Sequence, residues 1–371
     1  MAAVPAMASP AGGSNTNRTD TISSILRAGN IVTGVRGTTR GNVVLTGSAA
    51  TGTGNQAVPF LYLGKLASAA GAVVSTLMPP FAGVTSATFY GPDTHSFNPA
   101  SIPAGQVRAV GSYLSSAAAP GVLNQGMIYL GRVNGSGGSW MSIDVPADGA
   151  HTVGHARACP RRRVHCFVMD TIAHSTMGDL VVGNYDLNPT VRGGVASGNA
   201  FIYNMTRRQW TLLRLGGSLS SLTTLYGIWQ DGGGRSPRYT LAGGSLTRGT
   251  LQAFLMNYNE RTGAFGKPRY FSYGNAPAVF THFDGITAVR GGFNLVAISS
   301  AQDASMAFVP ASGRSFGRAT WYPVQVSTSP LCSGGCAAVT GNTVYRNHVM
   351  GIYIPTDSGV IHSYLATVRG R

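Results

Sequence analysis

Histidine, tyrosine and aspartate side chains that can exchange protons recur at similar places in several repeated stretches of this chain. A histidine or tyrosine base, combined with an arginine that neutralises a carboxylate, suits β-elimination on a uronate polymer. Hydrolysis of a glycosidic bond instead needs two carboxylates across a site. Of twelve acidic residues, Asp144, Asp179 and Asp186 occupy turn positions of the repeat, which leaves Asp93, Asp231 and Asp284 as the best candidates. The candidate catalytic residues of an enzyme are thus His174, His282, Tyr90, Tyr226 and Asp284.

A second set of residues interrupts the repeated pattern and has the chemistry to contact a ligand. Aromatic faces can pack against sugar rings, and guanidinium groups form paired hydrogen bonds with carboxylates or sulfates. We expect these residues to surround the mouth of a central channel, although each is also of a type common in ordinary loops. The candidate ligand-binding residues are Trp229, Asp231, Arg36, Arg290, Tyr345, Arg346, Asp93 and His95.

Four short β-strand signals, separated by Gly, Ser, Asn and Pro, form the repeating unit that must position these side chains. In the clearest copy they cover residues 87–91, 105–113, 126–131 and 140–146. Four short strands with turn residues between them are typical of one propeller blade. Aromatic residues that recur from copy to copy, such as Tyr129 and Trp140, are expected to pack blade against blade.

Six copies of the unit follow one another from Asn30 to the C-terminus. The sixth lacks a fourth strand, and residues 21–26 are expected to supply it, because joining first to last removes open sheet edges. No stretch shows sustained helical periodicity. The predicted fold is an all-β propeller of six four-stranded blades, with five or seven blades as alternatives. Residues 1–20 are expected to form a flexible tail, a remnant of an export or processing segment, and residues 21–371 a single domain.

The repeat resembles the extracellular HAF-type repeat of bacterial exported proteins. The likeness rests on strand signals that include Tyr226-Gly227-Ile228, Val110-Gly111-Ser112-Tyr113, Pro59-Phe60-Leu61-Tyr62 and Ile143-Asp144-Val145-Pro146. It extends over most of the chain, but several copies lack the Gly-Ile pair or the closing proline. The resemblance implies secretion and a repeated β-fold, and it implies no particular activity.

The charge of the chain is strongly positive, with 27 Lys+Arg against 12 Asp+Glu and a net charge of +15. A positive field favours anionic partners such as acidic polysaccharides, while the arginine content of a GC-rich genome would give the same bias without a functional reason. The arginines are scattered over turns, which argues against a specific nucleic-acid site. No run of 18 apolar residues is present, so no membrane span is predicted.

Four cysteines occur as two local pairs, Cys159/Cys166 and Cys332/Cys336. Two loop-closing disulfides are expected, as in exported proteins. Zinc is the less favoured alternative because neither pair has the two-residue spacer of a zinc ribbon. No metal or cofactor is therefore predicted, and the protein is expected to be secreted, periplasmic or on the cell surface. Arg161, Arg162 and Arg163, inside the first loop, are either an anchor for anionic surfaces or a solvated turn.

Together these observations predict a secreted, monomeric propeller that binds an extracellular polymer, in particular an anionic carbohydrate, at the channel mouth. The first alternative is a polysaccharide-degrading enzyme on the same scaffold, either a lyase or a glycoside hydrolase. The second is a scaffold that binds other proteins through its blade edges.

Overall fold

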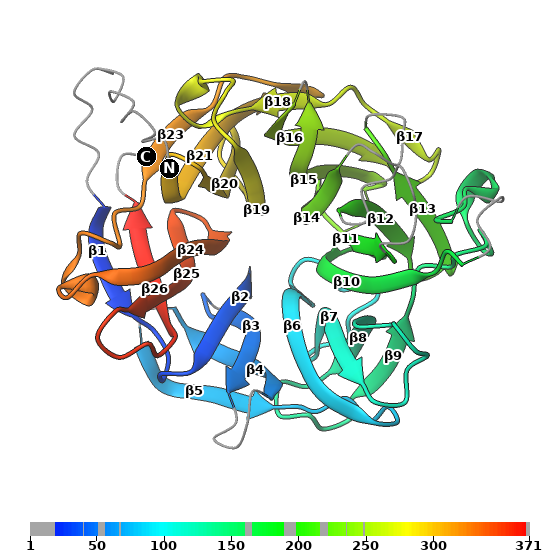
Figure 1. Cartoon of the computed structure of the whole chain (residues 1–371), viewed down its shortest axis with the longest axis horizontal. Helices are drawn as coiled ribbons and strands as arrows, with labels where there is room; N and C mark the ends of the chain where they lie inside the picture. Colours follow the sequence, from blue (N-terminus) through cyan, green and yellow to red (C-terminus); the bar gives the residue numbers. More distant parts are fainter. Residues whose placement is uncertain are drawn as a thin grey trace.

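Six β-sheets surround a central axis in the computed structural model (Figure 1). The structure describes residues 19–39, 41–50, 56–66, 68–159, 165–188, 198–215, 222–234, 236–247 and 249–368. Each sheet is one blade of four or five antiparallel strands, so the prediction of an all-β propeller with six blades is confirmed. The only helical segments among the described residues are three short 3-10 turns at Val153–His155, Tyr273–Asn275 and Pro330–Cys332.

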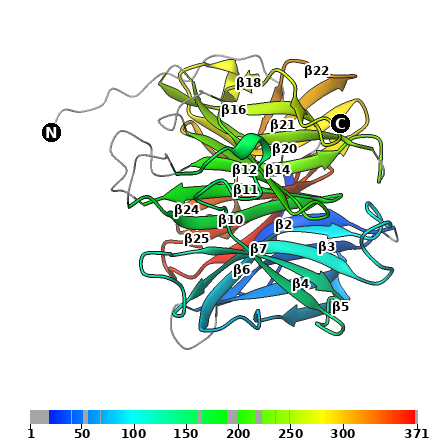
Figure 2. The same ribbon diagram turned by 90° about the vertical axis from the view of Figure 1, so that its right-hand side faces the viewer.

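The strands follow the chain from blade to blade (Figures 1 and 2). In blades 1 to 5 the first strand lies innermost, whereas blade 6 takes its outermost strand from the N-terminal end of the chain (Figure 1). Blade 1 contains β2 (Asn30–Gly37), β3 (Val43–Ala50), β4 (Ala57–Lys65) and β5 (Ser68–Thr76). Blade 2 contains β6 (Val84–Thr94), β7 (Val107–Ser115), β8 (Gln125–Gly131) and β9 (Ser139–Ile143). Blade 3 contains β10 (Val168–Met177), β11 (Leu180–Leu187), β12 (Asn199–Asn204) and β13 (Gln209–Leu213).

Blades 4 and 5 each split the outermost strand into two short pieces. Blade 4 contains β14 (Thr223–Gln230), β15 (Arg238–Thr247), β16 (Thr250–Asn259), β17 (Ala264–Phe265) and β18 (Arg269–Phe271). Blade 5 contains β19 (Thr281–Val289), β20 (Gly292–Ser299), β21 (Gln302–Ser312), β22 (Ser315–Phe316) and β23 (Thr320–Pro323). Blade 6 contains β24 (Cys336–Tyr345), β25 (His348–Pro355) and β26 (His362–Val368), and it is completed by β1 (Thr19–Ser24).

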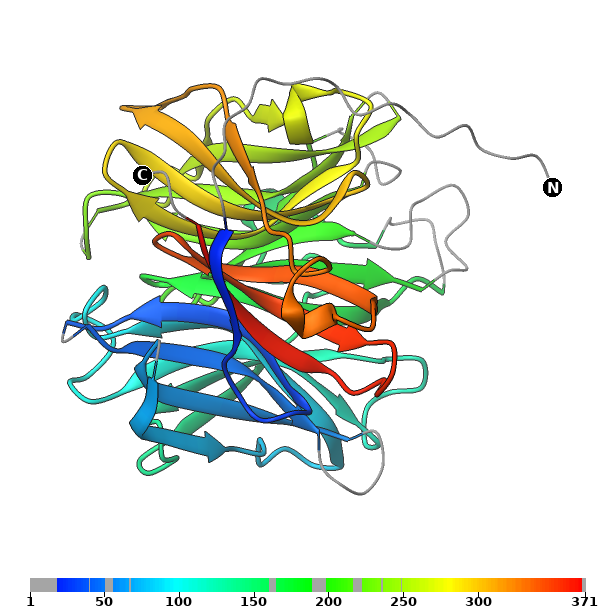
Figure 3. The ribbon, with the colours of Figure 1, turned by 90° about the vertical axis from the view of Figure 1, so that its left-hand side faces the viewer.

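The ring is closed by pairing the two ends of the chain. β1 lies antiparallel to β26, with pairs from Thr19 with Val368 to Ser24 with Tyr364 (Figure 3). The predicted N-terminal closing strand is thus confirmed. It already begins at Thr19, two residues inside the segment expected to be a tail. Ser363 reinforces the joint because its hydroxyl accepts a hydrogen bond from the Val32 amide and donates one to the Asn30 carbonyl.

The hydrophobic core lies between neighbouring blades. One cluster joins Val110 and Ile128 of blade 2 to Val181, Tyr185 and Phe201 of blade 3, and similar clusters follow around the ring. The recurring aromatic residues belong to these clusters, as expected of repeats that bury their faces only by stacking. Apolar packing therefore fixes the distance of every blade from the axis.

Both predicted disulfides are formed, between Cys159 and Cys166 and between Cys332 and Cys336. Residues 161–163, the proposed cationic anchor, lie outside the described residues. No helix in the described part of the chain is long and apolar enough to span a membrane.

Candidate functional site

A β-bulge interrupts the innermost strand of every blade near the middle of the channel. In each of β2, β6, β10, β14, β19 and β24 the pairing to the next strand skips one residue well inside the strand, and β6, β10 and β24 have a second irregularity near their start. Each residue skipped inside the strand is partly exposed, whereas the residues before and after it are buried. Bulges re-aim side chains and are frequent beside active sites. The six bulge residues are Thr33, Tyr90, His174, Tyr226, Asp284 and Asn342.

All six bulge residues meet around one central cavity of about 220 Å³, and Ile298 of β20 is its seventh lining residue. Glycine follows the bulge residue in four of the six blades, at Gly34, Gly91, Gly227 and Gly285. A Cβ at Gly34 would overlap the Tyr90 carbonyl oxygen of the next blade, and one at Gly91 would lie 2.5 Å from the His174 carbonyl oxygen. The glycines thus allow neighbouring inner strands to approach closely, which keeps the cavity narrow.

Two of the bulge residues are used to tie blades together. Asn342 donates a hydrogen bond from its amide to the Val32 carbonyl of blade 1, at 2.8 Å. Thr33 donates from its hydroxyl to the Phe89 carbonyl of blade 2. The side chains available for chemistry therefore come from blades 2 to 5, where Tyr90, His174, Tyr226 and Asp284 form one arc of the ring.

The aromatic members of this arc contact one another in sequence. The ring centroids of Tyr90 and His174 are 4.9 Å apart, those of His174 and Tyr226 are 4.0 Å apart, and those of Tyr226 and His282 are 4.4 Å apart. Burial, with a smaller contribution from His282, lowers the pKa of His174 to about 3. Burial, followed by the negative charge of Asp284, raises the pKa of Tyr226. At neutral pH the arc therefore presents an uncharged imidazole and an uncharged phenol.

Asp284 is held by a chain of hydrogen bonds that begins in the blade 4 sheet. The Gly244 amide donates to Thr224 Oγ1, and Thr224 Oγ1 lies 2.7 Å from His282 Nε2. His282 Nδ1 lies 2.9 Å from Asp284 Oδ1. Both ring nitrogens of His282 are thus engaged, one by the threonine and one by the carboxylate, and this fixes the orientation of the imidazole.

The other carboxylate oxygen of Asp284 has no hydrogen-bond partner among the described residues, although it is buried. Buried acceptors in native proteins nearly always have a partner. An orphaned carboxylate oxygen on a residue that lines a cavity therefore indicates where a ligand hydroxyl or a water molecule would donate.

Two further acids, Asp186 and Asp170, lie near this arc. Asp186, like Asp284, acts to raise the pKa of Tyr226, and Asp170 acts to raise the pKa of Tyr90. Asp170 accepts from Asn124 Nδ2 at 2.6 Å, and Asp186 accepts from the Gly198 amide at 2.7 Å. Burial raises the pKa of Asp186. Asp186, set aside above as a turn residue, instead lies within β11, so that reasoning was wrong.

The five candidate catalytic residues thus do converge. Four of them line the cavity, and His282 is hydrogen-bonded to Asp284. None of the candidate ligand-binding residues lines this cavity, and among them only Arg36 approaches the arc, in an adjoining recess of about 30 Å³. Trp229 lies at the C-terminal end of β14, with its ring 5.1 Å from the Arg36 guanidinium. Asp231 follows in the next loop and accepts from the Thr240 hydroxyl, and burial raises its pKa to about 6. His95 Nδ1 lies 2.7 Å from the Ile102 carbonyl oxygen in the loop after β6.

Asp93 and Arg36 are buried, contrary to their predicted role as ligand contacts. Asp93 is 0% exposed and accepts hydrogen bonds from the amides of Thr94 and Gly178. Arg36 is 5% exposed and donates to the carbonyls of Pro92 and Thr176. Arg36 and Arg108 offset part of the burial that raises the pKa of Asp93. A buried carboxylate needs such partners, so these charges hold blades 1, 2 and 3 together.

The remaining predicted contacts lie at the ends of the inner strands of blades 5 and 6. Arg290 and Arg346 are exposed, and the Arg346 guanidinium lies 5.3 Å from the Tyr345 ring centroid. The predicted single ring of Tyr, His, Arg and Trp is therefore divided along the axis. The five candidate catalytic residues lie at or beside the bulges, and the eight candidate ligand-binding residues lie toward or just beyond the C-terminal ends of the inner strands.

The sequence reasoning missed Thr33, Asn342, Thr224 and Asp186. A usable signal was present for Thr33, since it precedes a glycine in the first strand of its blade, as Tyr90, Tyr226 and Asp284 do. Within the described residues, no group of three or more His, Cys, Asp or Glu side chains could hold a metal ion.

No family model and no curated protein sequence matches this chain. Solved structures with a similar fold include the α-L-arabinofuranosidase of Fusarium graminearum with arabinobiose, which is 9% identical, with 91% of this chain and 93% of that chain aligned and a TM-score of 0.52. The α-L-arabinanase of Penicillium chrysogenum complexed with arabinobiose is 10% identical, with 95% of this chain and 96% of that chain aligned and a TM-score of 0.51. At such low identity the likeness establishes the propeller fold alone.

Proposed function

We propose that this protein binds a carbohydrate in the central cavity, with the arc of Tyr90, His174, Tyr226 and Asp284 as the contact surface. The observation that carries the proposal is the convergence of six bulged inner strands on one cavity of about 220 Å³. This is smaller than the roughly 300–1,000 Å³ of sites for drug-sized ligands. It suits a single sugar ring, such as the terminal unit of a polymer.

The chemistry of the arc suits the hydroxyl groups of a sugar. Phenol and neutral imidazole groups both donate and accept hydrogen bonds, and the unpartnered oxygen of Asp284 adds an acceptor. Aromatic side chains also offer apolar surface to the C–H face of a sugar ring. The two similar propellers that were solved with arabinobiose support the idea that this architecture can hold a sugar at all.

An uncharged sugar fits this cavity better than the anionic one expected from the net charge. Its lining residues include the acid Asp284 and no arginine. Arg36 reaches only a narrow inner recess of about 30 Å³, where its guanidinium is bonded to backbone carbonyls. The β-elimination mechanism needs a cation against the uronate carboxylate, so this arrangement disfavours the lyase alternative.

Hydrolysis of a glycoside is the second candidate function. It is favoured by the hydrogen-bonded chain from Thr224 through His282 to Asp284 and by a second carboxylate, Asp186, that affects the same phenol as Asp284. Asp186, whose pKa is raised, suits the proton donor, while the oriented Asp284 suits the base or nucleophile. The two disulfides support export for either function.

Binding and cleavage can be separated with one panel of neutral oligosaccharides, tested by calorimetry and by product chromatography. Binding without products supports the first function, and loss of binding in Tyr226→Ala locates it at the arc. Products that disappear in Asp284→Asn, while binding persists, support hydrolysis. The matched control is Asp303→Asn, an exposed acid on β21. A full response in Tyr226→Ala or an equal loss in Asp303→Asn would contradict the assignment.

A further inference from the structure

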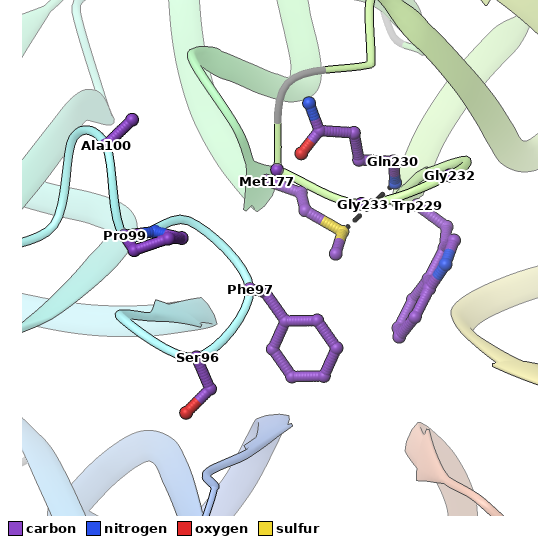
Figure 4. Close-up of a pocket in the computed structure, with 10 residues that line it drawn as sticks. Ser96, Phe97, Pro99, Ala100, Met177, Trp229, Gln230, Gly232 and Gly233 are labelled. Carbon is purple, nitrogen blue, oxygen red and sulfur yellow. Dashed lines mark hydrogen bonds between the residues drawn. The ribbon is translucent and has the colours of Figure 1, made fainter.

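Two adjoining cavities lie at the C-terminal ends of β6, β10 and β14, away from the central arc. The first has a volume of about 570 Å³ and is lined by Phe97, Met177, Trp229 and small loop residues (Figure 4). The second, of about 510 Å³, is lined mainly by polar side chains from the same loops and from blade 4. Ala100, Gln230 and Gly234 line both cavities, so the two form one divided site.

The first cavity is an aromatic compartment with a preformed shape. Phe97 and Trp229 meet edge to face, with ring centroids 5.5 Å apart and an interplanar angle of 75°. The Arg36 guanidinium lies within 6 Å of both ring centroids. The backbone N–H of Gln230 donates a hydrogen bond to Met177 Sδ at 3.1 Å, shown as a dashed line in Figure 4. Polarisable sulfur and crossed aromatic rings are a favourable surface for another aromatic ring.

Glycines bring the two loops of the site together. A Cβ at Gly234 would lie 2.9 Å from the Phe97 carbonyl oxygen, so the loop after β14 could not approach the loop after β6 with a larger residue there. Gly232 and Gly233 have φ values of 82° and 83°, which favour glycine. The loop after β6 is further fixed because Asn98 Nδ2 donates to the Gly178 carbonyl at 2.8 Å.

The hydrogen bonding of Gln230 indicates that the site holds a ligand. It is 5% exposed, and its Nε2 donates to the Ser236 carbonyl and the Tyr239 hydroxyl. Its Oε1 is buried and has no partner among the described residues. Ser101 Oγ, in the polar compartment, is also buried without a described partner. An unpaired buried amide oxygen is costly, and a ligand that donates hydrogen bonds would satisfy it.

Among the described residues, the charged side chains that line the polar compartment balance one another. Its lining contains Arg207 and Arg261 together with Asp179 and Glu260. Both carboxylate oxygens of Glu260 are already engaged, one by Asn204 Nδ2 at 2.7 Å and the other by the Tyr239 hydroxyl at 3.3 Å. The compartment therefore suits an uncharged group rich in hydroxyls.

We infer that this divided site binds an aryl glycoside, with the aromatic ring in the Phe97–Trp229 compartment and sugar hydroxyls donating to Gln230 and Ser101. The inference is independent of the function proposed for the central cavity, because the two sites share no lining residue. It also gives Trp229, which departs from the repeated tryptophan positions and packs against two inter-blade clusters, a role in addition to packing.

The test uses the full chain and 4-methylumbelliferyl glycosides of glucose, galactose, xylose and arabinose, with saturation-transfer NMR for binding and titration for affinity. We expect at least one glycoside to bind more tightly than 4-methylumbelliferone or the free sugar. Trp229→Ala and Ser101→Ala should weaken it by about tenfold and about threefold, the usual effects of an aromatic contact and of one hydrogen bond.

Asp303→Asn, an exposed acid on β21 that lines neither the divided site nor the central cavity, is the matched control and should leave this affinity unchanged. Circular dichroism and a thermal melt establish that each variant is folded, and Phe97→Leu replaces Trp229→Ala if the latter is not. Absence of binding by the whole panel, equal binding of 4-methylumbelliferone alone, or unchanged affinity in the folded aromatic variant would each overturn the inference.

Discussion

Replacing Gly34 by alanine tests whether the glycines after the bulges are what allow the inner strands to close around the axis. A Cβ at Gly34 would overlap the Tyr90 carbonyl oxygen and approach Thr46 Oγ1 at 2.5 Å and Pro92 Cδ at 2.8 Å. Because the first obstacle is backbone of the next blade, side-chain rotation cannot relieve the clash. The result is overpacking with a displaced blade.

Overpacking of a well-packed interior typically costs about 1–3 kcal/mol, and we expect Gly34→Ala to lie near about 3 kcal/mol. For a chain of this size, an unfolding entropy of about 2.1 cal/mol/K per residue converts that loss into a drop in Tm of about 4 °C. The loss of stability should increase as the distance from the added Cβ to its nearest neighbouring atom decreases. Gly91→Ala, with 2.5 Å to a carbonyl oxygen, should cost less, and Gly285→Ala, with 3.2 Å to Thr343 Cα, should cost least.

The assay is a thermal melt of the three variants beside Gly317→Ala, where the nearest atoms belong to the Pro310 ring at 3.3 Å and the site lies outside the channel. Gly317→Ala should change Tm little, since the ring edge can shift. Equal Tm values for Gly34→Ala and Gly285→Ala would refute the reasoning, because the order of distances would then not determine the order of stability.

Three other perturbations have outcomes fixed by the structure. The pKa of His174 is lowered to about 3 in the folded protein, so on acidification the histidine is protonated in the unfolded chain before it is protonated in the folded one. The free energy of unfolding should therefore fall as the pH drops from about 6.5 toward 3. His174→Gln should make Tm less dependent on pH between pH 4.5 and 7.5. The pKa of Asp231 is raised to about 6 in the folded protein, so the stabilisation that comes from its protonated form is present at low pH and is lost as the pH rises through about 6. Asp231→Asn should therefore raise Tm at pH 7.5 more than at pH 4.5. Deletion of residues 1–24 removes the five β1–β26 pairs, so Tm should fall. Light scattering should reveal association of molecules through the exposed edge of β26. A monomeric variant with an unchanged Tm would contradict the role of β1 in closing the ring.

The fold was largely predictable because propeller blades depend on local information. Each strand is short, each turn carries Gly, Asn, Ser or Pro, and the missing fourth strand of the last copy indicates how the ring must close. Splitting of the outermost strands of blades 4 and 5 was not predicted. The separate pieces β17 and β18 pair one after the other with β16, and the three residues between them, which include Pro268, form no strand pairs.

The candidate site was predicted only in part, because two different causes make a residue depart from a repeat. His174 and Asp284 depart from it because they face the cavity. Asp93 and Arg36 depart from it because a buried acid in blade 2 requires cations from blades 1 and 2. Sequence spacing does not separate these causes, since the electrostatic interaction between Arg36 and Asp93 joins residues on different blades. The glycine after the bulge does carry that information for four of the six inner strands.

The high net charge of the chain and the lining of the two candidate sites favour different kinds of partner. The arc around the central cavity contributes one formal charge, from Asp284, and the polar compartment at the other site balances two arginines against two acids. The described lining residues of the two sites therefore account for little of the net charge of +15. A field of this size raises the local concentration of anionic polymers and is screened by salt over about 10 Å at 0.1 M. Attraction to an anionic matrix should thus depend on ionic strength, while recognition of an uncharged sugar in the cavity should not.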